Sequence, residues 1–270
     1  MKILDCRPLA TEWAAKIKAD IENYSASRRP CLLVITDGTD PASQVYIRQK
    51  VNAGERCNIN VIVYKVHTKE ELFAAVTRAN SDDSIDGIII QQPCLNLSFQ
   101  ELRDLVRPDK DVDGFNRNSD YYPCTPDGII NLLHLFDYNP SGKHCVVIGR
   151  SEIVGKPLAR MLLDQNASVS VIHSKTPDHI RQALLQNADM VFCCVGKPGL
   201  IQPKDVKDDA VIVDVGITRL DNGKIRGDAG PTDVWANTNV ALTPVPGGVG
   251  PMTVTMLMAH TCASWKRWHD

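Results

Sequence analysis

Short apolar runs alternate with amphipathic stretches along this chain, and that alternation restricts the fold more than any other feature. In the first half the apolar runs lie at 31–36, 60–66 and 86–92, and helical patterns occupy 41–57 and 68–82 between them. Apolar runs without polar alternation are typical of parallel strands that are covered on both faces by helices. The first half therefore predicts a β-α-β-α-β unit with a parallel sheet.

A passage rich in Pro and Asp, at 107–114, interrupts this order, and a second series of the same kind follows it. The apolar runs of the second series are 144–149, 168–173, 190–195, 210–216 and 241–246, and helical patterns begin at 154 and 177. The chain ends with a predicted helix over 250–268, which by pattern alone fits either half. We predict an α/β protein with two α/β domains, each built on a parallel sheet.

Composition narrows the class of partner and the compartment. The chain has 270 residues and a formal net charge of −2, and it contains no basic block. Binding to nucleic acid requires a basic surface, so we expect no nucleic-acid partner and favour a small molecule instead. Nine scattered cysteines without a CxxC pair predict reduced thiols in the cytoplasm and no metal site. No apolar stretch approaches the roughly 20 residues of a membrane span, so we expect neither an anchor nor a membrane partner.

A first group of polar residues follows the predicted strands of the first half. Tyr46 and Lys50 are spaced i and i+4 on the predicted helix 41–57, Gln91 ends the strand GIIIQ, and Asp111 and Asp113 follow in a turn. Open parallel sheets bind ligands at the carboxyl ends of their strands, where an amine, an amide and a carboxylate would converge. Spacing alone favours an exposed helix that carries a solvated lysine, and the amide and the carboxylates shift the balance toward a site.

A second group has the strand, turn and helix order of a dinucleotide site. Gly149 ends one strand and Gly155 begins the next helix, although the spacing is not GxGxxG and a plain tight turn would also explain it. The following strand ends in 173–175, HSK, where an NAD site usually has Asp or Glu. These donors, together with Arg150 and Ser151, suit a 2′-phosphate and favour NADP over NAD.

The stretch 243–253, TPVPGGVGPMT, has three glycines and three prolines in eleven positions. Glycine permits positive φ and close approach of the main chain to a ligand, and the helix that begins near Pro251 offers unpaired N–H groups. The stretch is either a rigid hinge or a wall that cofactor and substrate share, and both can hold.

Six motifs occur in a characteristic order: PASQVYIRQK, QQP after GIII, PDKDVDGF, PCTPDG, GRSEIVGKP and TPVPGGVGPMT. In this order the chain resembles the bifunctional methylenetetrahydrofolate dehydrogenase/methenyltetrahydrofolate cyclohydrolases of one-carbon metabolism. The resemblance implies a folate-binding catalytic domain of residues 1–120 plus 250–270, a Rossmann-like NADP domain of residues 121–249, and an active-site cleft between them. It also implies NADP-dependent oxidation of methylenetetrahydrofolate, hydrolysis of the methenyl product, and a homodimer formed through the second domain.

The resemblance also assigns residues. The catalytic group is Lys50, Tyr46, Gln91 and Asp113, which bind folate together with Pro246, Gly247 and Gly248 in the loop that begins at Val245. The positions matched to NADP binding are Gly149, Arg150, Ser151, Ile153, Val154, Gly155, His173, Ser174, Val195, Gly196 and Ile217.

Five positions depart from the family pattern: Asn52, Gln92, Asn116, Asp127 and the segment 228–230. A charge gained at Asp127 or lost within 228–230 would alter cofactor binding. Three alternatives stay open at this point: a cyclohydrolase with weak or lost dehydrogenase activity, a non-catalytic nucleotide-binding protein, and a dehydrogenase of the amino-acid or shikimate type.

Overall fold

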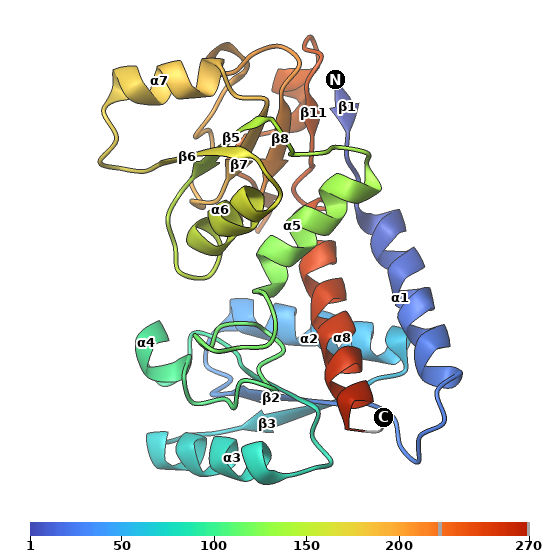
Figure 1. Ribbon diagram of the computed structural model, residues 1–270. Coiled ribbons are helices and arrows are strands. Elements are labelled where there is room, and N and C mark those ends of the chain that lie inside the picture. Colours follow the sequence, from blue (N-terminus) through green and yellow to red (C-terminus); the bar gives the residue numbers. More distant parts are fainter. Residues whose placement is uncertain (221–222, 269–270) are drawn as a thin grey trace. The chain divides into compact units, whose positions relative to one another are not determined.

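The computed structural model describes residues 1–220 and 223–268, which form two compact units, each built on a parallel sheet (Figure 1). Unit 1 contains Met1–Ala10 and Thr125–Thr253, and unit 2 contains Thr11–Cys124 and the segment from Val254 onward. Two helices run from one unit into the other, α1 (Arg7–Glu22) and α8 (Val249–Arg267). The predicted α/β class with parallel sheets is confirmed.

Unit 2 is built on a three-stranded parallel sheet in the order β3 (Asn60–Lys65), β2 (Cys31–Thr36), β4 (Gly87–Ile90). The crossover helices α2 (Pro41–Cys57) and α3 (Lys69–Ser81) lie on opposite faces of this sheet in Figure 1, and the short helix α4 (Phe99–Leu102) follows β4. Every residue of β2 and β4 is buried, as their uninterrupted apolar sequences predict. Strand β3 lies at the edge and is largely exposed.

Helix α2 begins and ends where its sequence requires. The Asp40 carboxylate accepts hydrogen bonds from the N–H groups of Ala42 and Ser43, and Pro41 occupies the first helical turn. The helix ends at Asn58, whose φ of 62° is the left-handed conformation that commonly terminates helices. These two signals fix which residues of α2 lie beside the end of β2.

Unit 1 contains a six-stranded parallel sheet in the order β1-β11-β8-β7-β5-β6. Its strands are β1 (Lys2–Ile3), β5 (His144–Ile148), β6 (Ser168–Ile172), β7 (Met190–Cys193), β8 (Val211–Asp214) and β11 (Ala241–Leu242). Its other elements are α5 (Cys124–Leu135), α6 (Gly155–Asp164), α7 (Asp178–Gln186), the 3-10 turns Pro203–Asp205 and Thr232–Trp235, and the antiparallel pair β9 (Thr218–Arg219) and β10 (Ile225–Arg226).

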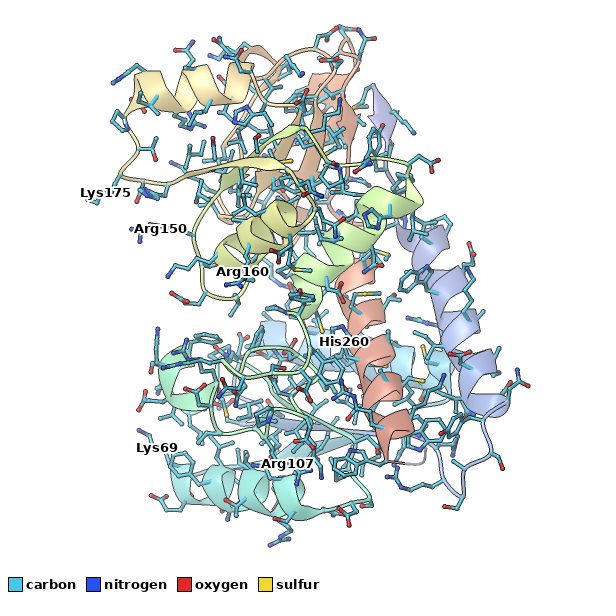
Figure 2. The ribbon with its side chains drawn as sticks, in the orientation of Figure 1. Lys69, Arg107, Arg150, Arg160, Lys175 and His260 are labelled. Carbon is cyan, nitrogen blue, oxygen red and sulfur yellow. The ribbon has the colours of Figure 1, made fainter. Side chains whose placement is uncertain are left out.

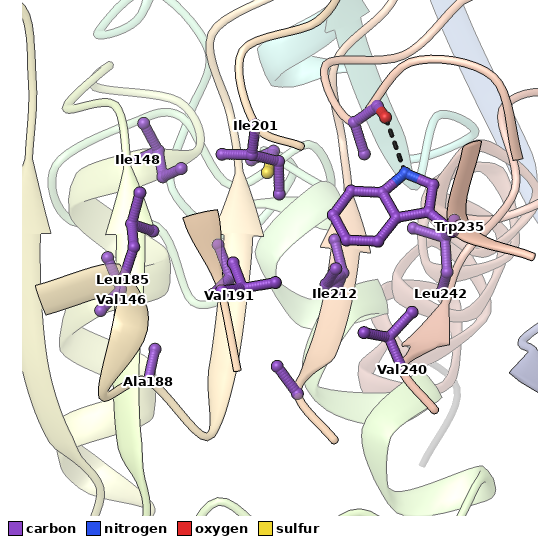
Figure 3. Packing of buried hydrophobic residues seen from close by; sticks show 14 of the residues in the cluster. Val146, Ile148, Leu185, Ala188, Val191, Ile201, Ile212, Trp235, Val240 and Leu242 are labelled. Atoms are coloured by element: carbon purple, nitrogen blue, oxygen red, sulfur yellow. Dashed lines mark hydrogen bonds between the residues drawn. The ribbon is translucent and has the colours of Figure 1, made fainter. Parts of the chain in front are cut away.

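Trp235 is the largest side chain in the core on one side of this sheet. Figure 3 shows it beside Ile212 of β8 and Leu242 of β11, in a cluster that extends across β7 to β5, and its indole N–H donates to the carbonyl of Ala229 at 2.9 Å. Because a buried indole N–H without a partner would be costly, this bond fixes the backbone at residue 229 against the core. That position matters for the dinucleotide site described below.

The domain boundaries differ from the predicted ones at the N-terminus. Residues 1–10 belong to unit 1, because β1 pairs in parallel with β11 at the edge of the six-stranded sheet. A strand of two exposed residues carries no periodicity that a sequence could reveal. Strand β11 itself ends at Leu242, well short of the predicted 246, because Pro244 and Pro246 have no N–H group for a ladder.

None of the helices in the described part of the chain is both long and apolar enough to cross a membrane.

Candidate functional site

Lys50 and Gln91 meet above the carboxyl ends of β2 and β4. The Lys50 ammonium donates to Gln91 Oε1 at 2.9 Å, and Gln91 Nε2 donates to the carbonyl of Gln92 at 3.0 Å. The backbone N–H of Gln91 also donates to the carbonyl of Ile35 at 2.8 Å, which extends the β2–β4 pairing by one residue. The amide that orients the lysine is therefore fixed at both its main chain and its side chain.

The loop that follows β4 is tied to the beginning of α2. Ser43 Oγ lies 3.0 Å from the carbonyl oxygen of Gln92 and 2.8 Å from the carboxylate of Asp40, and its single hydrogen is shared between these two acceptors. Asp37 accepts the N–H of Leu95 at 2.7 Å. These bonds hold the loop against the helix that carries Lys50, so the distance between the amine and the amide does not depend on a freely moving segment.

Asp113 is the third member of the group, and its charge acts on that of Lys50. Burial lowers the pKa of Lys50, and the negative charge of Asp113 partly opposes this effect. Burial likewise raises the pKa of Asp113, while Lys50 and the Cys124 side chain favour its charged form. Each group is thus easier to neutralise than in water, and each stabilises the charged form of the other. The structure brings Lys50, Gln91 and Asp113 together.

The backbone around Asp113 is held by a glycine and by its own turn. Gly114 has a φ of +75°, and a Cβ at this position would lie 2.4 Å from the main chain of Tyr122. Only glycine fits this turn, in which the Gly114 N–H donates to the carbonyl of Asp111 at 3.0 Å. The turn directs the chain away immediately after the carboxylate.

Two neighbours of Asp113 were not predicted. Cys124 interacts with both Lys50 and Asp113, and His260, from α8, lies 3.6 Å from the Cys124 sulfur. Cys124 stands inside the PCTPDG motif, so its proximity to the site could have been expected from the sequence. His260 lies in an apolar helix far along the chain, and no local signal points to it.

Other predicted positions have local roles or are exposed. Tyr46 lies one turn before Lys50 on α2 and is partly buried. Asn52, which departs from the family pattern, is exposed on the same helix. Asn116, another departure, donates its amide to the carbonyl of Val106 at 2.8 Å and its N–H to Asp111 at 2.7 Å, so it holds the loop that follows the site.

In unit 1 the predicted dinucleotide residues all follow the carboxyl ends of adjacent strands. Strands β6, β5, β7 and β8 are neighbours in the sheet, in that order. The residues that follow them are His173 and Ser174 after β6, Gly149 to Gly155 after β5, Val195 and Gly196 after β7, and Ile217 after β8. This edge is where parallel sheets of this type bind their ligands.

The turn after β5 requires both of its glycines. Gly149 has a φ of +116°, and a Cβ there would lie 2.6 Å from the carbonyl oxygen of Cys194. A Cβ on Gly155 would lie 2.4 Å from the carbonyl oxygen of Gly149. Ser151 Oγ accepts the N–H groups of Val154 and Gly155 at 3.2 and 3.3 Å, which caps the beginning of α6. The chain thus passes tightly from strand to helix, and a side chain at either glycine would collide with the backbone.

The donors predicted for a 2′-phosphate lie at the ends of the two neighbouring strands. His173 Nδ1 accepts the N–H of Lys175 at 3.2 Å, so the neutral ring carries its proton on Nε2 and presents a donor there. Arg150, Ser174 and Lys175 are exposed, and Figure 2 shows Arg150 and Lys175 projecting outward from the same side of unit 1. No acidic residue follows β6 in the segment 173–177.

Three large apolar side chains are exposed at the same edge. Ile153 is 38% exposed, Val195 is 49% exposed and Ile217 is 42% exposed, and they follow three adjacent strands. Apolar side chains that gather at a polar sheet edge are typical of ligand pockets, in which they cover flat rings.

The turn after β7 is held from behind by a buried carboxylate. Asp228 has no exposed surface and accepts the N–H groups of Val195, Gly196 and Lys197 at 2.8, 3.1 and 2.6 Å. The charge that the segment 228–230 lacks relative to the family pattern is at Gly230, whereas Asp228 is present and holds the predicted cofactor turn.

Asp214, at the end of β8, holds Asp228 in turn. Its carboxylate accepts the N–H groups of Asp228 and Ala229 at 2.9 and 2.8 Å. Burial raises the pKa of Asp214 to about 6, and the charge of Asp228 adds to that rise. The two buried carboxylates accept backbone N–H groups that would otherwise need water as their hydrogen-bond partner.

The predicted loop 245–248 leads from β11 into α8 and belongs to unit 1. Pro246 is exposed, whereas Gly247 and Gly248 are buried. The carbonyl of Gly247 accepts the N–H of Cys6 at 2.9 Å, and the N–H of Gly248 donates to the carbonyl of Pro244 at 2.7 Å. The predicted folate residues therefore divide between the units, with Tyr46, Lys50, Gln91 and Asp113 in unit 2 and Pro246 to Gly248 in unit 1.

Two family models match this chain and together span most of it. The NAD(P)-binding domain of tetrahydrofolate dehydrogenase/cyclohydrolase matches residues 123–269, and the catalytic domain of the same family matches residues 4–113. The chain belongs to the tetrahydrofolate dehydrogenase/cyclohydrolase family. The resemblance drawn from the six motifs is confirmed.

Individual relatives in this family cover nearly the whole chain. The bifunctional protein FolD of Staphylococcus saprophyticus is 42% identical and is matched over 98% of this chain and 97% of its own length. The bifunctional FolD enzyme of Campylobacter jejuni is 37% identical, with a TM-score of 0.94 and 99% of each chain covered. The Trypanosoma brucei FolD enzyme, solved with NADP and an inhibitor, is 30% identical, with a TM-score of 0.90 and coverage of 98% of this chain and 97% of its own.

Family membership decides between the protein families that share the two-domain α/β plan, and a dehydrogenase of the amino-acid or shikimate type is set aside.

The departure from the family pattern at Asp127 has a local structural explanation in this chain. Asp127 lies in the first turn of α5, where the helix dipole favours a negative charge, and it accepts the amide of Asn131 at 3.0 Å.

Proposed function

We propose that this chain oxidises methylenetetrahydrofolate to methenyltetrahydrofolate with NADP and then hydrolyses the methenyl product to formyltetrahydrofolate. The observation that carries the proposal is the convergence of Lys50, Gln91 and Asp113 at one sheet edge. Membership of the family and the NADP-bound relative support the same activity.

Lys50 suits the hydrolytic step as a proton acceptor. The methenyl group is a cation, so a neutral amine near it is favoured over an ammonium. Burial already lowers the pKa of Lys50, and a bound cation would lower it further. The amine would take a proton from the attacking water and return a proton to the folate nitrogen that leaves as the ring opens. Gln91 holds the amine for both transfers through the 2.9 Å hydrogen bond.

Asp113 suits the aminopyrimidine edge of the pterin. A carboxylate can accept two parallel N–H bonds from such an edge, which fixes both position and orientation. Because the carboxylate is partly buried and its backbone turn is fixed by Gly114, little ordering is needed when folate binds. Tyr46, one turn before Lys50, would contact the folate from α2.

The residues present in unit 1 fit a dinucleotide. The Gly149 and Gly155 turn leaves room for a pyrophosphate at the beginning of α6, and Ile153, Val195 and Ile217 offer apolar contact to rings. When bound, NADP supplies a hydride acceptor. The chain contributes position to that step, because hydride transfer needs the rings held face to face and no acid or base.

NADP rather than NAD is favoured by the donors after β5 and β6. The oxygens of a 2′-phosphate would accept hydrogen bonds from Arg150, Ser174 and the Nε2–H of His173, and an NAD ribose would instead need a carboxylate here.

The decisive experiment mixes the purified protein with methylenetetrahydrofolate and NADP and follows NADPH and methenyl absorbance together. We expect NADPH to form with a methenyl intermediate that decays, and NAD to support a lower kcat/KM. Hydrolysis of added methenyltetrahydrofolate without NADPH formation would indicate a cyclohydrolase that lacks the dehydrogenase. Absence of both signals would contradict the proposal and leave a non-catalytic nucleotide-binding protein.

We also propose a homodimer through unit 1. Strand β6 lies at the edge of its sheet with Val171 41% exposed, and Leu163 of the neighbouring helix α6 is 56% exposed. Light scattering after size exclusion should give twice the chain mass, and Val171→Lys should reduce the measured mass.

A cytoplasmic location is favoured by nine free cysteines. Fractionation of expressing cells tests it.

A further inference from the structure

His260 is a buried polar residue close to Asp113, and neither the sequence motifs nor the proposed mechanism uses it. It is 9% exposed, and Figure 2 labels it on α8. Its Nδ1 lies 3.0 Å from the carbonyl oxygen of Val112 and 3.6 Å from the sulfur of Cys124. The Cys124 sulfur lies 3.2 Å from the same carbonyl. Three groups therefore meet at the residue that precedes Asp113.

The contact with Val112 assigns the tautomer of the ring. A carbonyl oxygen only accepts, so the 3.0 Å contact requires the hydrogen on Nδ1. A protonated Nδ1 cannot accept the thiol hydrogen of Cys124. The Cys124 thiol donates to the Val112 carbonyl at 3.2 Å, and a hydrogen bond from the same side chain favours the charged form of Asp113.

Besides the contact of Nδ1 at its edge, the imidazole ring is held at one face. Tyr121 stacks on it with ring centroids 5.0 Å apart and an interplanar angle of 28°. Arg267 lies 5.2 Å from the Tyr121 ring centroid and pairs with Asp120 at 2.6 Å. Because the ring is held at its Nδ1 edge and at one face, Nδ1 stays directed at the Val112 carbonyl.

We propose that His260 is a positioning residue for folate binding: it holds the Val112 carbonyl and turns the Cys124 thiol toward Asp113, which fixes that carboxylate in its binding orientation. The inference rests on the proposed function, in which Asp113 holds the pterin. His260 touches neither substrate nor cofactor in this scheme and acts through its two neighbours.

A matched pair of substitutions separates positioning from packing. In His260→Asn the side-chain amide places an N–H donor where Nδ1 stood but removes the ring. In His260→Phe the ring and its stacking on Tyr121 remain but the donor is lost. Packing alone predicts that Phe is the milder change, whereas positioning predicts that Asn is milder. His67→Phe, at an exposed residue of unit 2, is the control.

The first measurement is folate affinity by titration calorimetry, with thermal unfolding to verify that each variant is folded. We expect His260→Phe to weaken folate binding about tenfold, His260→Asn to weaken it less than threefold, and NADP affinity to stay unchanged in both. In an Asp113→Asn background, His260→Phe should cause no further loss, because both changes act on one carboxylate. Equal losses in the two variants, a larger loss for Asn, or no loss in either would overturn the proposal.

The second measurement needs no folate. Titratable groups that face Asp113 are Lys50, Cys124 and His260, with Asp111 on the same segment. Loss of the thiol hydrogen bond removes support for the carboxylate, so the pKa of Asp113, followed by carboxyl NMR, should rise in His260→Phe but not in His260→Asn. If the unaltered protein binds no folate, the proposed function fails while this titration still decides the role of His260. An unchanged titration in His260→Phe would remove that role.

Discussion

The two units build their candidate sites in opposite ways. In unit 2 the site consists of side-chain groups, an amine, an amide and a carboxylate, which are already hydrogen-bonded or charge-paired with one another. In unit 1 the site consists mainly of backbone, with one turn that requires two glycines and a loop whose three N–H groups are held by Asp228. Two of the side chains that we propose select NADP, Arg150 and Ser174, are exposed.

The two units therefore differ in what their site residues do: those of unit 2 carry reactive or binding groups, and those of unit 1 mainly hold the backbone in place. We expect that a single functional group in unit 2 can be deleted without disturbing the fold, because Lys50 lies on a helix, Gln91 follows a strand and Asp113 lies in a turn, and other bonds hold each segment. In unit 1 the groups that matter most are buried behind the ligand edge, so their loss should change stability and cofactor binding together. The following changes test that contrast, from the largest expected effect to the smallest.

Lys50→Met should lower cyclohydrolase kcat by about 10³-fold, because it removes the proton acceptor and leaves the rest of the site in place. Folate affinity should change less than threefold. Stopped-flow decay of methenyl absorbance measures the first and calorimetry the second. Lys69→Met, at an exposed lysine of α3, is the control. Ordinary hydrolysis rates in Lys50→Met would exclude a role for the lysine.

Asp214 should make the folded state less stable as pH rises. Its pKa in the folded protein is about 6, against 3.8 in the unfolded chain, so the folded state binds the proton more tightly. The stabilisation that this proton gives is fully present below pH 3.8 and is lost as pH rises through about 6, a change of about 3 kcal/mol. Urea unfolding of the wild type and of Asp214→Asn from pH 4 to 8 isolates this contribution as a difference. A difference that grows with pH would contradict the sign.

Asp113→Asn should weaken folate binding about 30-fold, or roughly 2 kcal/mol, since hydrogen bonds to a charged acceptor are replaced by bonds to a neutral one. NADP affinity and the unfolding temperature should be unchanged. Calorimetry with each ligand makes the comparison. Undiminished folate affinity would mean that the pterin lies elsewhere.

Asp228→Asn should weaken NADP binding about tenfold and also lower stability by on the order of 1 kcal/mol, because an amide offers one oxygen to three N–H donors. Folate affinity of unit 2 should not change. Asp233→Asn, at an exposed position of the same unit, controls for charge. Loss of NADP affinity with full stability would break the contrast between the units.

Arg150→Ala should reduce the preference for NADP over NAD about fivefold, or about 1 kcal/mol, as expected for an exposed charge pair. Steady-state kcat/KM with both cofactors measures it, and Lys204→Ala serves as a control. An unchanged ratio would assign the 2′-phosphate to His173, Ser174 and Lys175 instead.

Much of the fold could be predicted because buried parallel strands appear in the sequence as short, uninterrupted apolar runs. Strands β2, β4, β5, β7 and β8 lie within the predicted apolar runs, and the helices α2, α3 and α6 begin within two residues of their predicted starts. Helix α5 was not predicted, since Pro126 and Gly128 resemble a turn. Pro126 is tolerated in the first helical turn, and Gly128 lies where a Cβ would come within 3.1 Å of the Met252 backbone.

The site could be predicted only where its parts follow strands directly. Lys50 and Gln91 follow β2 and β4, which are adjacent, so their meeting is a consequence of topology. His260 reaches Val112 through the packing of α8, a contact across 148 residues that no spacing encodes. For Asp228 the sequence is misleading in the opposite way. The motif comparison marks the segment 228–230 as altered, yet the Asp228 carboxylate keeps its hydrogen bonds in the structure.

Strand β1 has a consequence for how the protein is made. Residues 2 and 3 are synthesised well before their partners in β11, Ala241 and Leu242. Unit 2 has most of its sequence available long before that point, so it can collapse on its own core during translation. The six-stranded sheet of unit 1 can be completed only after residues 241 and 242 have been synthesised and have paired with residues 2 and 3.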